Sequence, residues 1–292
     1  MTAFISLLLS IVLLTGCKEE AAEPTAVASP AITAATASAT PAPSATPADP
    51  AAGCFPTPSE LGNPGPLRRQ DVDGATVFVA QGVTDEDRQR VLDGLATARA
   101  YLAREFGPVQ RHVCIELRAE DLHTGSAITI QNRIIVFTQR GGWSRPYPWL
   151  LSRATAHEYV HVWTAEVAND FAPATSSAYG PGWLVEGVAE FLSMRMVLEA
   201  GLAPREETEM FSNTLLRLSN ATLEELEPLP LPNPEDYATA ELAVSRLMTS
   251  RPLSALQTFY TLLGRRTAWP AAFATAFGVA PHEFYRQFAA TP

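Results

Sequence analysis

Residues 156–164 read AHEYVHVWT, with a glutamate directly after the first of two histidines that are four positions apart. On a helix, His157 and His161 lie one turn apart on the same face, so their imidazoles can converge on one point. Glu158 lies near that point without being a ligand. This H-E-x-x-H spacing suits a metal ion held by two neutral nitrogens, with a carboxylate that accepts a proton from water. The alternative is a helix that carries two structural histidines.

A second glutamate pair completes the set of candidate ligands. A catalytic zinc ion needs three protein ligands and one open position. Residues 182–192 read GWLVEGVAEFL, in which Glu186 and Glu190 stand one helical turn apart among mostly apolar residues. Two inward-facing carboxylates are costly to bury unless they are paired or ligated, which favours a metal site. The alternative, a solvated acidic face, has few other polar residues to form it.

These two motifs resemble those of a known enzyme family. H-E-x-x-H followed by W-L-x-E-G-x-A-E is similar to the gluzincin metallopeptidases, specifically the peptidase MA-like group related to the aminopeptidases. The resemblance implies Zn²⁺ as the cofactor, bound by His157, His161 and Glu186. It also implies that Glu190 hydrogen-bonds a ligand histidine and fixes its orientation. The similarity covers roughly residues 64–290, but it is specific only at the two motifs.

The same resemblance implies a hydrolytic mechanism on a peptide or protein substrate. Glu158 would act as the general base, and the segment DYATAELAVSRLM (residues 236–248) suggests Tyr237 as the donor to the oxyanion. The glycine-rich strand of the aminopeptidases is not recognisable. Residues 125–137 occupy its place, and their edge could bind an extended peptide by strand addition.

Two other functions are compatible with these motifs: a non-catalytic envelope lipoprotein that retains a zincin scaffold, and a zinc-dependent peptidoglycan or amide hydrolase. The formal net charge is −10, and the 21 Lys and Arg residues form no basic run, so nucleic acid is not an expected partner. We expect a monomer. His112, His123 and His282 have no partner at metal-ligand spacing and are expected to be surface or structural residues.

The N-terminus predicts an exported, lipid-anchored protein. The apolar run 3–14 is too short to span a bilayer and is typical of a signal peptide. The following Leu-Thr-Gly-Cys resembles the bacterial lipobox, which implies cleavage after residue 16 and lipidation of Cys17. The protein would then be extracytoplasmic and attached to the cell membrane or envelope. An ordinary signal peptide with an incidental cysteine is the alternative.

The other two cysteines, Cys54 and Cys114, remain as an even pair in an oxidising compartment. A disulfide between them is therefore favoured over two unpaired thiols. Between the lipidation site and this pair, residues 17–53 are rich in Ala, Thr, Pro and Ser, which predicts a disordered tether.

The remaining sequence predicts an α+β fold of zincin type. A small sheet and one long helix, capped by Thr84 and ended by Gly107, form an N-terminal α/β part (residues 54–165) that includes the H-E-x-x-H helix. A second helix carries the glutamate pair, and residues 166–292 form an all-α part of the same catalytic domain. The strands are expected within residues 75–82, 111–121 and 126–139.

Overall fold

A computed structural model describes residues 49–54, 56–57, 61–119, 127–138, 147–169 and 180–290. These residues belong to one compact unit, Pro47–Pro292. The predicted signal peptide, the predicted lipidation site Cys17 and most of the predicted tether lie outside the described residues, as does His123. No helix in the described part of the chain is long and apolar enough to cross a membrane.

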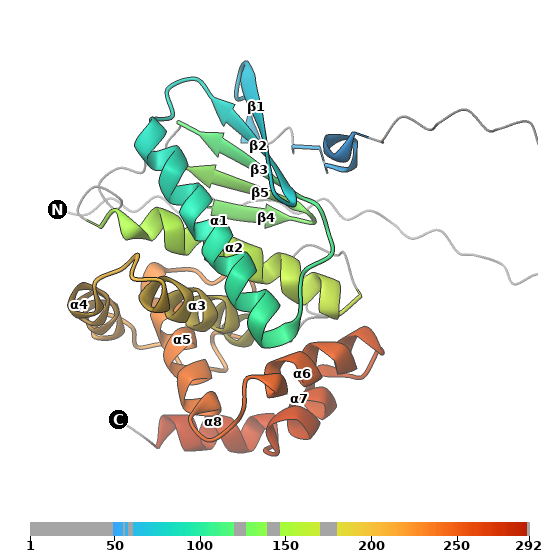
Figure 1. Cartoon of the computed structure of the whole chain (residues 1–292). Coiled ribbons are helices and arrows are strands. Elements are labelled where there is room, and N and C mark those ends of the chain that lie inside the picture. The colour runs from blue at the N-terminus through green and yellow to red at the C-terminus, as the bar shows by residue number, and fades with distance from the viewer. Residues whose placement is uncertain are drawn as a thin grey trace, which may run out of the picture. The chain divides into compact units, whose positions relative to one another are not determined.

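The N-terminal half contains a five-stranded mixed sheet with the strand order β1-β2-β3-β5-β4 (Figure 1). The strands are β1 (Leu67–Val72), β2 (Ala75–Ala80), β3 (Val113–Arg118), β4 (Ala127–Ile130) and β5 (Arg133–Phe137). The three central strands are parallel, and each edge strand is antiparallel to its neighbour. Every residue of β3 and β5 is buried, as expected for strands covered on both faces. The short strand β4 forms one edge.

Strand β1 was not predicted, because its sequence LRRQDV has little of the apolar alternation of a half-buried strand. It forms a hairpin with β2, in which Val72 pairs with Ala75 across a two-residue turn at Asp73 and Gly74. Gly74 has a φ of 67°, a conformation that favours glycine. The Asp-Gly pair was the available signal for this hairpin.

Helices α1 (Asp85–Phe106) and α2 (Trp149–Val167) cover one face of the sheet (Figure 1). The hydroxyl of Thr84 accepts a hydrogen bond from the backbone N–H of Asp87, which is the predicted N-cap. The two helices are in close backbone contact, since a Cβ atom added to Gly94 of α1 would lie 2.8 Å from the Cα of Ser152 in α2. This contact holds α2 between the sheet and the helical half.

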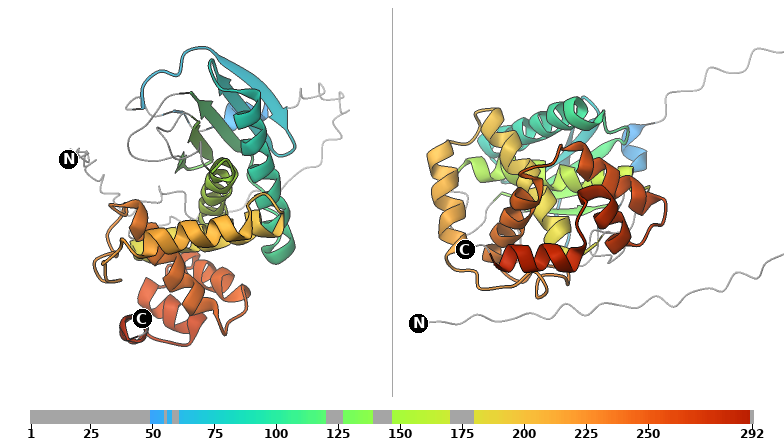
Figure 2. Two further views of the ribbon diagram at one scale, coloured as in Figure 1. Left: turned by 90° about the vertical axis from the view of Figure 1, so that its left-hand side faces the viewer. Right: turned by 90° about the horizontal axis from the view of Figure 1, so that it is seen from below.

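The C-terminal half is entirely helical within the described residues, which together with the sheet confirms the predicted α+β class. Its helices are α3 (Gly182–Glu199), α4 (Arg205–Leu216), α5 (Pro234–Met248), α6 (Ser254–Gly264), α7 (Trp269–Phe277) and α8 (Pro281–Ala289). Figure 2 shows α6 to α8 gathered on the side of α3 and α5 away from the sheet. Trp183 of α3 is fully buried against Phe273 and Phe284, which ties α3 to this cluster.

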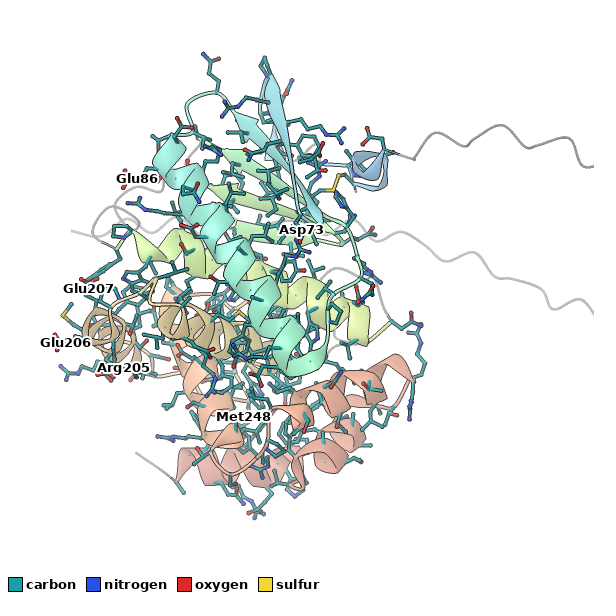
Figure 3. All side chains as sticks on the ribbon, in the orientation of Figure 1. Asp73, Glu86, Arg205, Glu206, Glu207 and Met248 are labelled. Atoms are coloured by element: carbon teal, nitrogen blue, oxygen red, sulfur yellow. A yellow bond between two sulfur atoms is a disulfide. The ribbon has the colours of Figure 1, made fainter. Side chains whose placement is uncertain are left out.

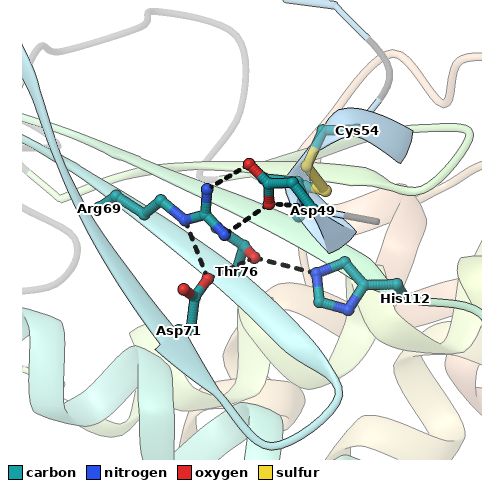
Figure 4. Close-up of polar contacts among 8 residues, drawn as sticks. Asp49, Cys54, Arg69, Asp71, Thr76 and His112 are labelled. Carbon is teal, nitrogen blue, oxygen red and sulfur yellow. Dashed lines mark hydrogen bonds and ion pairs between the residues drawn. A yellow bond between two sulfur atoms is a disulfide. The ribbon is translucent and has the colours of Figure 1, made fainter. Parts of the chain in front are cut away.

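The start of the folded unit is fastened to the sheet. Cys54 and Cys114 form a disulfide with a Cα–Cα distance of 5.7 Å, so the alternative of two unpaired thiols is wrong. Nearby, Arg69 of β1 donates hydrogen bonds of 2.7 and 2.8 Å to the two carboxylate oxygens of Asp49 and one of 3.0 Å to Asp71 (Figure 4). These contacts join the residues before β1 to the hairpin.

The sheet face away from α1 and α2 holds a buried charge cluster. Glu116 is fully buried and accepts hydrogen bonds from Thr57 (2.6 Å), Arg118 (2.7 Å) and Arg133 (2.6 Å). Arg118 also donates to the carbonyl oxygen of Leu61. Because alternate residues of a strand share a face, Glu116 and Arg118 lie on the same side of β3 as the disulfide. By contrast, Figure 3 shows the labelled side chains of Glu86 on α1 and Glu206 on α4 at the surface of the unit.

Candidate metal centre

Helix α2 brings the two histidines into the protein interior. Most of its residues are buried on all sides, because the helix lies between α1, the sheet and α3. The exposed fractions of His157, His161 and Glu158 are 7, 6 and 8%. Buried imidazoles need a polar partner, so the environment of their ring nitrogens decides what the site can do.

Helix α3 supplies that partner. The Nε2 atoms of His157 and His161 lie 3.1 Å apart, and Oε2 of Glu186 lies 3.1 Å from the first and 3.4 Å from the second. Within the described part of the chain, this is the only group of three side chains that could share a metal ion. Glu186 is only 8% exposed, which excludes the alternative of a solvated acidic face.

The spacing of these three atoms fits a zinc ion. In a tetrahedral site with Zn–N distances near 2.0–2.1 Å, neighbouring ligand atoms are separated by about 3.3 Å. The three distances in the structure, 3.1, 3.1 and 3.4 Å, match one face of such a tetrahedron. Both Nε2 atoms point at the same oxygen, Oε2 of Glu186, as expected for three ligands of one ion.

The ionisation of the site depends on its internal contacts. Burial disfavours the charged form of His161, but the charge of Glu186, a hydrogen bond to it and the charge of Glu158 together raise the pKa of His161. Burial acts against the charged form of Glu186 as well, yet the two histidines lower the pKa of Glu186 well below its usual range. The carboxylate is therefore held in the ionised form that a metal ligand requires.

A second tier of charged residues lies beside the ligands. Oε1 of Glu190 lies 3.0 Å from Nδ1 of His157, but the two atoms do not have the geometry of a hydrogen bond. Oε2 of Glu190 contacts the guanidinium of Arg153. Arg153 also interacts electrostatically with Glu241 of α5.

This buried region carries excess negative charge. Its buried carboxylates are those of Glu158, Glu186 and Glu190, and its one permanent cation among the described residues is Arg153. Uncompensated buried carboxylates are costly, and a divalent cation would offset most of the excess. The charge balance and the ligand spacing thus indicate the same kind of occupant.

The two residues expected to contact substrate lie around the same site. The charge of Glu158 acts on His161, and the backbone carbonyl oxygen of Glu158 accepts a 3.0 Å hydrogen bond from Thr129 of β4. Tyr237, on the first turn of α5, is partly buried, and its ring centroid lies 6.4 Å from that of His157. The structure therefore brings residues from α2, α3, α5 and β4 to one place.

The remaining histidines lie apart from this site. Nε2 of His112 is 3.0 Å from the hydroxyl of Thr76 (Figure 4), and His282 is exposed on α8. Sequence reasoning missed Arg153 and Glu241. Arg153 stands four positions before His157, and Glu241 four positions after Tyr237, so helical spacing from the named residues was the available signal.

Comparison with known proteins gives structural likeness only. No family model and no curated protein matches the sequence. The M1 zinc metallopeptidase from Deinococcus radiodurans is similar with 17% identity over 77% of this chain and 51% of that chain, at a TM-score of 0.48. A mutant of that enzyme gives 17% identity, coverage of 78 and 53%, and a TM-score of 0.49.

An aminopeptidase N family protein from Idiomarina loihiensis is 15% identical over 77% of this chain and 44% of that chain, with a TM-score of 0.46. The chain thus spans about half the length of these solved structures. At such identities and TM-scores the likeness adds nothing to the chemistry of the site, which rests on the ligand geometry and the buried charge of this protein.

Proposed function

We propose that this protein is a zinc-dependent metallopeptidase that hydrolyses peptide bonds. The observation that carries the proposal is the triangle of His157, His161 and Glu186, whose ligand atoms have the spacing of a tetrahedral zinc site inside a region with excess negative charge. When bound, zinc would polarise the carbonyl of the substrate and lower the pKa of a water molecule to about 7.

The protein's own residues would move the protons. Glu158 adjoins the first ligand and is buried beside the site, so it is the candidate to remove a proton from water and to deliver it to the leaving amine. Tyr237 is the candidate to donate a hydrogen bond to the oxygen that becomes negatively charged. Both roles require a substrate carbonyl between α2 and the first turn of α5.

Strand β4 offers a way to hold that substrate. It pairs with β5 on one side, and no other described strand pairs with its second edge. The bond from Thr129 to Glu158 keeps this edge beside the proposed general base. An extended peptide that adds to β4 as a further strand would therefore pass along the metal site. This arrangement would allow cleavage at internal peptide bonds as well as near the ends of a peptide.

The proposal includes a location. The N-terminal sequence favours export and a lipid on Cys17, which would put the enzyme on the outer side of a cell membrane or in the envelope. Metabolic labelling with a radioactive fatty acid would be expected to mark the unsubstituted protein but not a Cys17→Ser variant.

A joint measurement of metal content and cleavage tests the proposed activity. The protein, a Glu158→Gln variant and a Glu199→Gln control are analysed for zinc and incubated with a casein-type substrate. Glu199 is a suitable control because it lies on α3 with a side chain that is 53% exposed. We expect about one zinc per chain in all three proteins, and loss of cleavage by at least about 10²-fold only in Glu158→Gln.

Other outcomes would identify other functions. Zinc without cleavage of casein by any of the three proteins would favour a scaffold protein. Release of cell-wall fragments in place of peptides would favour a peptidoglycan hydrolase. Equal cleavage by the unsubstituted protein and Glu158→Gln would refute the role of Glu158.

A further inference from the structure

One carboxylate joins a ligand histidine to a buried arginine. Arg153 lies on α2 one turn before His157, and its side chain is only 13% exposed. Its guanidinium contacts Oε2 of Glu190. Oε1 of Glu190 lies 3.0 Å from Nδ1 of His157 as an ion-pair approach without hydrogen-bond geometry. Among the described residues, Arg153 is the only permanently charged cation in contact with Glu190.

A second carboxylate interacts electrostatically with the same guanidinium. Glu241 of α5 is partly buried, and burial raises its pKa while the charge of Arg153 opposes that rise. Burial also lowers the pKa of Arg153, but an arginine side chain remains charged in proteins. Arg153 thus contacts a carboxylate from α3 and interacts electrostatically with one from α5.

Stability alone does not account for this arrangement. A buried ion pair contributes little over an apolar pair of the same volume, because desolvation of the charges offsets their attraction. The placement of the Glu190 carboxylate gives a better explanation for Arg153. Without Arg153, the carboxylate of Glu190 would face the negative charges of Glu186 and Glu241 without a compensating charge, and it would be repelled from its place beside His157.

We propose that Arg153 is a positioning residue, which holds Glu190 against Nδ1 of His157 so that Nε2 of this histidine faces the metal site. The inference rests on the zinc site of the proposed function. A partner at the second nitrogen fixes the tautomer and ring orientation of a ligand histidine, and loss of such a partner typically weakens metal binding by about 10–100-fold. Arg153 touches neither metal nor substrate and acts through Glu190.

Zinc affinity, measured without turnover, tests this role. The dissociation constant for Zn²⁺ is determined by competition with a chromophoric chelator for the full-length protein, Arg153→Met, Arg153→Lys, Glu190→Gln and the double variant Arg153→Met/Glu190→Gln. Arg195→Met is the control, because Arg195 lies on α3 but donates to the hydroxyl of Tyr101. The melting temperature of each metal-free protein is recorded in parallel.

We expect Arg153→Met to weaken zinc binding by about 10–100-fold, Arg153→Lys by less, and Arg195→Met by nothing measurable. In the Glu190→Gln background, the Arg153→Met change should have almost no further effect. Unchanged affinity in Arg153→Met, or the same loss in both backgrounds, would overturn the proposal. If Arg153→Met does not fold, Glu190→Gln decides, because Arg153 acts through Glu190: unchanged zinc affinity in Glu190→Gln would overturn the proposal.

The affinity measurements test the role of Arg153 separately from the proposed peptidase activity. A protein that binds zinc but cleaves no peptide would refute the peptidase activity and leave the role of Arg153 open to this affinity test. Absence of zinc binding by the unsubstituted protein would overturn both.

Discussion

Gly187, directly after the ligand Glu186, is the position where a single methyl group should separate two helices of the site. A Cβ atom added there would lie 2.8 Å from the carbonyl carbon of Ala240 and 2.9 Å from a methyl group of Val244, both in α5. Ordinary contacts begin at 3.4 Å, so α5 would have to move by at least about 0.6 Å. The glycine of the E-G motif is therefore explained by the close approach of α3 and α5.

The expected loss of stability is a balance of two effects. Alanine is favoured over glycine inside a helix by about 0.8–1.0 kcal/mol. Overpacking against a backbone that must shift costs about 1–3 kcal/mol, and contacts this short with two residues point to the upper half of that range. The net destabilisation of Gly187→Ala is then about 1–2 kcal/mol, which corresponds to a fall in Tm of about 2–8 °C for a unit of this size.

The turnover number kcat should also fall, even at temperatures where the Gly187→Ala protein is fully folded. Tyr237 lies on the same helix as Ala240, and misplacement of a catalytic group by about 1 Å can reduce turnover by about 10²-fold. We expect kcat for a casein-type peptide to fall by about 10–100-fold in Gly187→Ala, at a temperature where the variant is folded, with zinc content unchanged.

Gly264→Ala is the matched control. Its added Cβ would lie 2.7 Å from the carbonyl oxygen of Ala168, a similar clash at the far end of α2. Tm should fall in this variant, measured by circular dichroism, while kcat stays within about twofold. A Gly187→Ala protein with a raised Tm and normal turnover would refute the reasoning. Such a result would mean that the added methyl group does not clash with α5 and that only the helix propensity of alanine is observed.

The other predictions concern the N-terminal half. Glu116→Gln should destabilise the protein by about 3–5 kcal/mol in urea unfolding, because it leaves buried arginines without their counter-charge; a change below 1 kcal/mol would count against the cluster. Cys54→Ser should cost about 4 kcal/mol, from the 60-residue separation of Cys54 and Cys114, with no further loss on adding reductant. Asp49 should titrate by NMR with a pKa of about 2, chiefly because Arg69 donates hydrogen bonds to it. Its pairing then adds stability above pH 4 that disappears as the pH falls towards 2; an ordinary pKa would mean that the Asp49–Arg69 pair does not form.

Much of the local structure could be predicted because its causes are local. The Thr84 cap, the apolar spacing of α1 and the stop at Gly107 all act within a few residues, and α1 begins and ends where they predict. Strand β1 could not be predicted in this way. Its polar sequence is tolerated because it is an edge strand with exposed positions, and its place in the sheet comes from pairing with β2.

The sequence alone established that His157 and His161 share a helix face and that Glu186 and Glu190 share another, because helical spacing fixes residues four positions apart. It could not establish that the two helices meet with their ligand atoms 3.1–3.4 Å apart. It also could not show that Arg153 contacts Glu190, or that Thr129 of β4 reaches Glu158. These arrangements depend on how apolar surfaces of α2, α3 and α5 pack together, and packing between distant segments leaves no spacing rule in the chain.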